Sequence, residues 1–109
     1  MAYSEPLASR IRRELIGQKA IVEKKMFGGV GFLLNGNMLV GIWKDLLIAR
    51  IGPEAGRQAL DEPFVREFDI TGRPMKGWVM VEPGGLAEPG ALASWIDRAR
   101  QFVSQLPAK

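Results

Sequence analysis

The dipeptide Asn35-Gly36 constrains the fold of this chain more than any other feature, because it separates two apolar runs, Val30–Leu34 and Asn37–Trp43. A two-residue type I′ turn needs a positive φ at both positions, and Asn-Gly is a pair that adopts this conformation readily. We therefore predict a β-hairpin whose turn is Asn35-Gly36.

A two-residue turn also fixes the register of this hairpin. It pairs Leu34 with Asn37 and Phe32 with Leu39. Alternation then places Val30, Phe32, Leu34, Leu39 and Trp43 on one face, and Leu33, Met38, Val40 and Ile42 on the other. Both faces are apolar, so one covering layer is not expected to be enough. If helices cover a single face, another subunit or a partner is expected on the second.

Three helices are predicted from start signals and from periodicity. Ser4 is placed to cap a helix over residues 4–16, with Pro6 tolerated in its first turn. Gly52 and Pro53 open a short helix that runs through about residue 60. Near the C-terminus, one helical face carries Leu92, Trp95, Ile96, Ala99, Phe102, Val103 and Leu106. We interpret that stripe as part of the core.

Four further strands are predicted, over residues 20–26, 46–51, 65–70 and 77–81. With the hairpin, the element order is α-β-β-β-β-α-β-β-α. Hairpin connections dominate this order, so we predict an α+β fold, a two-layer sandwich in which helices pack on a mainly antiparallel sheet.

The composition excludes several kinds of chemistry. The chain has 109 residues, which fits one domain over residues 1–109, and it contains no Cys and no His. The first absence excludes disulfides, zinc-thiolate sites and a cysteine nucleophile, and the second excludes Ser-His-Asp chemistry and histidine metal sites. No apolar run approaches the roughly 20 residues that span a bilayer, and residues 1–10 do not resemble a signal peptide. We expect a cytoplasmic protein without membrane contact.

Positive charge is concentrated near the N-terminus. The chain has 15 basic and 12 acidic residues, and the excess comes from Arg10, Arg12, Arg13, Lys19, Lys24 and Lys25. A nucleic-acid footprint needs such charges on one face, whereas the three arginines cover more than one face of the predicted helix. A solvated helix surface is the simpler interpretation, and nucleic-acid binding through these residues is kept as an alternative.

The candidates for catalysis and for phosphate binding are weak. The glycine-rich run Phe27–Gly31 leads into a strand, not a helix, and lacks the Gly-Lys-Ser/Thr of a Walker loop. Without His, a base must be a carboxylate or Lys, and no spacing pairs Asp69 with Glu82. We predict no catalytic, cofactor-binding or metal-ligating residue. An enzyme or small-ligand binder would need a deep polar pocket holding Asp69, Glu82 or Arg50.

A binding surface is predicted in the turn before the last strand. Arg73, Met75, Lys76 and Trp78 combine two cations, a flexible thioether and an indole, which are residue types enriched at interfaces. The alternative is that Met75 and Trp78 pack into the core while the two cations are solvated. Both interpretations remain open from the sequence.

Several motifs occur in an order that can be compared with known families. Met26-Phe27-Gly28-Gly29-Val30-Gly31-Phe32 is followed by Gly36-Asn37-Met38-Leu39 and then by Leu46–Arg50. Together they resemble the N-terminal domain of TfoX, also called Sxy. Residues 72–83 and 92–96 are similar to the short stand-alone members of that family. The resemblance covers about residues 4–106.

The resemblance implies a two-layer α/β sandwich with an antiparallel sheet, similar in outline to secretion chaperones. Full-length TfoX proteins are bacterial regulators of natural competence that act on transcription with the cyclic-AMP receptor protein. They carry a C-terminal helical domain, which we expect this chain to lack. The family offers no catalytic residues, and its signature residues imply turns and packing, at Met26, Phe27, Gly28, Gly29, Gly31, Gly36 and Trp78.

We therefore expect a non-enzymatic regulatory module, without a cofactor or metal, that binds a protein partner or a second copy of itself. Nucleic-acid association is the alternative, and a small-ligand binder or an enzyme is the third reading.

Overall fold

A computed structural model describes residues 3–26, 28–69, 72 and 75–108. The helices are α1 (Glu5–Glu14), α2 (Pro53–Ala59) and α3 (Ala91–Val103), with a short 3-10 turn, η1 (Pro83–Leu86). The strands are β1 (Ile21–Met26), β2 (Gly29–Leu34), β3 (Asn37–Trp43), β4 (Leu46–Arg50), β5 (Val65–Glu67) and β6 (Trp78–Val81). The predicted order of elements is confirmed.

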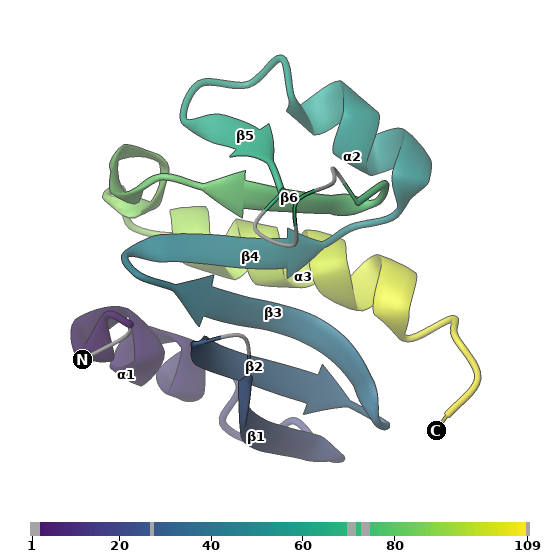
Figure 1. Cartoon of the computed structure of the whole chain (residues 1–109). Coiled ribbons are helices and arrows are strands. Elements are labelled where there is room, and N and C mark those ends of the chain that lie inside the picture. Colours follow the sequence, from purple (N-terminus) through teal and green to yellow (C-terminus); the bar gives the residue numbers. More distant parts are fainter. Residues whose placement is uncertain (1–2, 27, 70–71, 73–74, 109) are drawn as a thin grey trace.

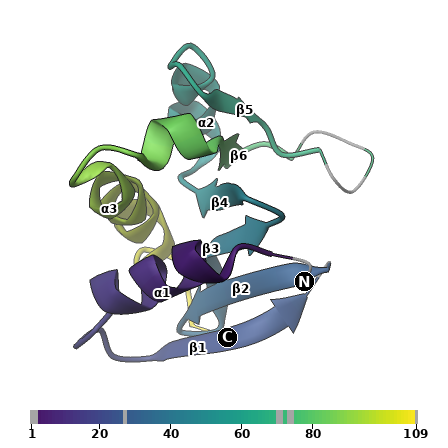
Figure 2. The ribbon, with the colours of Figure 1, turned by 90° about the vertical axis from the view of Figure 1, so that its left-hand side faces the viewer.

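The six strands form one sheet in the order β1-β2-β3-β4-β6-β5, and every pairing is antiparallel. Helices α1 and α3 lie on one face of this sheet, and α2 lies beside its β5–β6 end (Figures 1 and 2). The α+β two-layer prediction is therefore confirmed. Helices of the described chain leave the opposite sheet face open (Figure 2).

Local signals place both early helices correctly. Ser4 caps α1, since its Oγ accepts a hydrogen bond from the Leu7 backbone N–H at 3.3 Å. Gly52 precedes α2 with a φ of 98°, and Pro53 occupies its first turn. The predicted bounds were slightly too wide, because α1 ends at Glu14 and α2 at Ala59.

The hairpin turn is confirmed, but the predicted register is wrong from Phe32 onward. Asn35 and Gly36 have φ values of 54° and 84°, and Leu34 pairs with Asn37. A β-bulge follows, so that Phe32 pairs with Val40 and not with Leu39. The extra residue reverses the alternation along the rest of β3.

This reversal corrects the predicted faces of the hairpin. Val40 and Ile42 join the helix-covered core, although the sequence placed them on the other face. Trp43 moves away from that core and packs with the cluster on the opposite face. The prediction that both faces are apolar still holds, because buried side chains form one cluster on each face of the sheet.

The larger cluster lies between the sheet and the helices. Its members include Phe32, Ile42 and Leu47 from the sheet and Ile96 from α3, each with at most 1% of its surface exposed. The predicted stripe of α3 faces this core, with five of its side chains buried: Leu92, Trp95, Ile96, Ala99 and Val103. This packing fixes which sheet face the helices cover.

The other strands are shorter than predicted. β4 ends at Arg50 and β6 begins at Trp78. β5 ends at Glu67, whereas the sequence extended it to Ile70, which lies outside the described residues. Phe68 and Asp69 follow β5 in irregular conformation.

Two paired glycines form the floor of the open sheet face. Gly31 of β2 lies opposite Gly41 of β3. A Cβ at Gly31 would lie 2.9 Å from Met26 Sδ, and one at Gly41 would lie 2.5 Å from Met38 Cε and 2.9 Å from the Val30 backbone oxygen. The two methionine side chains therefore lie directly over the glycines.

These contacts predict different costs for two matched substitutions. Gly41→Ala should lower the free energy of unfolding by about 1–3 kcal/mol, because a backbone oxygen blocks the new methyl group. Gly31→Ala should cost under about 1 kcal/mol, since the end of a flexible methionine side chain can move aside. Urea unfolding of both variants measures the difference, and equal costs would contradict this packing.

Candidate interaction surface

The open face is the sheet surface opposite α1 and α3, and we define it by cross-strand rows of side chains. Its central row is Lys24, Gly31, Gly41, Ile48, Met80 and Arg66. One flanking row contains Val22, Leu33, Met38, Arg50 and Trp78. The other contains Met26, Gly29, Trp43 and Leu46. Most positions on the open face are therefore glycine or apolar.

The part of this face over β1, β2 and β3 is mostly apolar and has glycines at its base. Met26, Leu33 and Met38 are half-buried, while Val22 is 58% exposed. Methionine side chains are unbranched and polarisable, so they adjust to the shape of an apolar partner. This region presents a glycine floor that two adaptable side chains cover.

The part over β4 and β6 is built around aromatic stacking. The rings of Phe68 and Trp78 stack with centroids 5.5 Å apart, and Phe68 is only 4% exposed. The Arg50 guanidinium lies 5.1 Å from the Trp78 ring centroid and 5.8 Å from that of Phe102. At the opposite end of the face, Lys44 Nζ lies 4.6 Å from the Trp43 ring centroid.

The predicted segment before β6 lies at the edge of this face, and the structure divides its residues between two roles. Met75 is 38% exposed and Lys76 is exposed, as a binding surface requires. Trp78 is half-buried in the aromatic cluster, as the packing interpretation expected. Arg73 lies outside the described residues.

The family-signature residues occupy turn and floor positions. Gly28 and Gly36 have φ values of 77° and 84°, a region that favours glycine. Gly29 pairs with Met26 across β1 and β2 and is buried. Phe27 lies outside the described residues, so its predicted packing is not described.

The sequence reasoning missed three contributors to this face: Gly41, Trp43 and Arg50. Regular alternation along β3 predicts the wrong face for Trp43, because the bulge reverses that alternation. Gly41 did carry a signal, since a glycine inside a strand often marks close backbone approach. The sequence predicts Arg50 only as a possible pocket residue, because nothing in the spacing places it beside Trp78.

Basic side chains outnumber acidic ones on the open face. Lys24, Lys44 and Arg50 form no ion pair within the described part of the chain. Arg66 is paired, since its Nη1 lies 3.3 Å from Glu82 Oε2. The face therefore combines apolar surface with unpaired positive charge.

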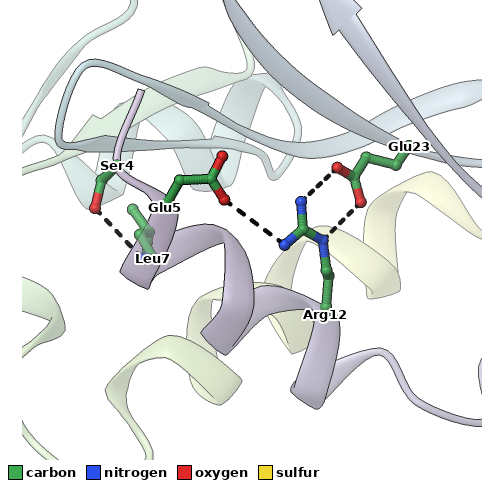
Figure 3. Close-up of polar contacts among 5 residues, drawn as sticks. All are labelled: Ser4, Glu5, Leu7, Arg12 and Glu23. Carbon is green, nitrogen blue, oxygen red and sulfur yellow. Dashed lines mark hydrogen bonds and ion pairs between the residues drawn. The ribbon is translucent and has the colours of Figure 1, made fainter. Parts of the chain in front are cut away.

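The N-terminal basic residues do not form a free basic stripe. Arg12 binds Glu23 of β1 through two hydrogen bonds, at 2.9 Å from Nε to Oε1 and 2.7 Å from Nη2 to Oε2 (Figure 3). Its Nη1 also lies 3.9 Å from Glu5 Oε1. Arg10 donates a 2.7 Å hydrogen bond to the Leu86 carbonyl oxygen. Two of the predicted cations are thus used in contacts within the fold.

Two cavities among the described residues are open to solvent. One of about 440 Å³ lies between Trp43 and Phe64 and contains the Arg66–Glu82 pair. A second of about 480 Å³ lies between α2 and α3. Asp69 and Arg50 line neither cavity. Among the described residues, no three acidic side chains gather as a metal site would require.

Comparison with known proteins bears on this fold. The family model of the TfoX N-terminal domain matches residues 14–103, which is most of the chain. The chain belongs to the TfoX N-terminal domain family. No curated protein and no solved structure matches it. None of the helices described for this TfoX N-terminal domain is long and apolar enough to cross a membrane.

Trp78→Ala in this TfoX domain should lower the free energy of unfolding by about 2–4 kcal/mol, because it removes the stacking partner of Phe68 and Arg50. Met75→Ala, at an exposed position, should change it by less than about 0.5 kcal/mol. Urea unfolding provides both values. A fully stable Trp78→Ala variant would show that this indole is not part of the core.

The Arg12–Glu23 contact predicts a pH dependence. The hydrogen bond from Arg12 lowers the pKa of Glu23 in the folded protein, and its burial opposes this only in part. The stabilisation is complete above the ordinary pKa of 4.5 and is lost as the pH falls through the lowered value. Because both side chains are about 40% exposed, it should not exceed about 1 kcal/mol.

Glu23→Gln should therefore be less stable than the natural protein at pH 7 and equally stable in strong acid. Unfolding by urea across this pH range measures the difference. A difference in the free energy of unfolding that stays constant down to acid pH would contradict an ionic contribution from Glu23.

Proposed function

We propose that this TfoX N-terminal domain is a non-enzymatic regulatory module that binds another protein through its open face. The observation that carries this proposal is the open face itself, where half-buried methionines lie over buried glycines and no helix of the described chain covers them. A sheet with two apolar faces is normally covered on both sides. The family supports a regulatory role, since full-length TfoX proteins are regulators.

The described cavities favour this proposal over an enzyme. Of the three residues expected in a polar pocket, Glu82 alone lines either of these two cavities, and it is held there by Arg66. Catalytic carboxylates are usually found with groups that shift their pKa and position a substrate. The Arg66–Glu82 pair is half-exposed and is what a surface ion pair looks like.

The nucleic-acid alternative receives less support. Arg10 and Arg12 are engaged inside the fold, and Glu23 places negative charge beside the basic residues of β1. A backbone footprint of the N-terminal residues needs their cations on one surface, whereas Lys24 and Lys25 lie on opposite faces of β1.

The proposal is tested by capture from a lysate of the source organism, treated with nuclease, using two matched variants. Val22→Glu places a charge on the open face, and Ile16→Glu places one beyond the end of α1, at positions 58% and 78% exposed. A partner protein should be retained by the natural protein and by Ile16→Glu and lost by Val22→Glu.

Three results would contradict the proposal. The first is an identical set of retained proteins for both variants. The second is enrichment that disappears with nuclease, which would favour nucleic acid. The third is recovery of the bait alone as a monomer. By contrast, a dimer that forms in the natural protein and is lost in Val22→Glu would identify a second copy of the chain as the partner.

A further inference from the structure

We infer that the open face binds an amphipathic helix whose flanks carry acidic side chains. This inference rests on the proposed function and specifies the chemistry of the partner. It combines three properties of the open face: its shape, its charge and the contacts that its aromatic rings already make.

The shape favours a helix. Gly31 and Gly41 leave a strip over β2 and β3, and Met26 and Met38 lie over these glycines. Neighbouring strands lie about 4.8 Å apart, so this strip is roughly 10 Å wide, close to the diameter of a helix with its side chains. Helices already cover the other face of the same sheet, and a partner helix would complete an α-β-α arrangement.

The charge favours acidic flanks. Lys24 lies at the β1 side of the strip, Lys44 at one end of β3, and Arg50 at the end of β4. None of these cations has a carboxylate at ion-pair distance within the described residues. Glu82 continues the flanking row that contains Trp43 and Leu46. Its carboxylate is held by Arg66. An apolar helix face flanked by Glu or Asp complements this pattern.

The same pattern disfavours a second copy of this chain as the occupant. Two open faces in contact would bring together surfaces that both carry unpaired cations, such as Lys24 and Arg50. Like charges brought together at an interface lower affinity. An acidic partner avoids this repulsion.

The aromatic rings of the open face already have partners, which disfavours single-stranded nucleic acid as its ligand. Bases bind sheet surfaces by stacking on aromatic rings that are free on one side. Here Trp78 is stacked with Phe68 and contacted by Arg50, and Lys44 lies over Trp43. The rings therefore have partners before any ligand arrives.

The test uses two synthetic helices of about 18 residues, long enough to form in water, with the same leucine face. One carries Glu on its flanks and the other carries Lys, and binding to the whole chain is measured by calorimetry. The Glu helix should bind at least about tenfold more tightly, and its affinity should fall as salt is added.

Charge reversal on the protein provides the matched control. Lys24→Glu, on the open face, should weaken the Glu helix by about threefold or more, whereas Lys19→Glu, in the turn before β1, should leave its affinity within about twofold. Both lysines are exposed, so neither change should affect folding.

The outcomes separate this inference from the proposed function. Equal binding of the two helices, or no binding of either, overturns the inference that the partner is an acidic helix. The proposed function would still stand if Val22→Glu loses a captured protein, because that loss identifies the open face as an interface. An unlabelled oligo-dT that displaces the Glu helix also overturns it, in favour of a polyanion site. Unchanged capture by Val22→Glu overturns the proposed function itself.

Discussion

The single extra residue in β3 determines what each face of the sheet presents. At the bulge, Leu39 and Val40 both turn toward the helices, and every later side chain of the strand changes face. Ile42 therefore enters the main core, and Gly41 and Trp43 point to the open side. Without the bulge, Val40 would lie opposite Gly31, and the pair of glycines at the floor of the open face would not exist.

Much of the fold follows from local chemistry, and for that reason it could be predicted from the sequence. The cap at Ser4, the Gly52-Pro53 start and the Asn35-Gly36 turn each act over a few residues. The stripe of α3 repeats at the helical period, so its buried face was also predictable. These signals were sufficient for the element order and for the antiparallel class.

The candidate surface was less predictable, because it depends on contacts between distant segments. Trp78 meets Arg50 only because β4 and β6 are neighbours, although β5 and α2 separate them in the chain. Met38 covers Gly41 only because the bulge changes their relative direction. In the segment before β6, Met75 is exposed, whereas Trp78 is half-buried and packs in the cluster on the open face.

Strand β1 has a consequence for how the protein behaves in concentrated solution. It is an edge strand, and edges with free backbone groups are places where sheets of different molecules join into aggregates. The exposed run Glu23-Lys24-Lys25 places charge along this edge, and lysine there raises the cost of adding another strand. Lys24, which borders the open face, therefore also disfavours the addition of strands from other molecules to this edge.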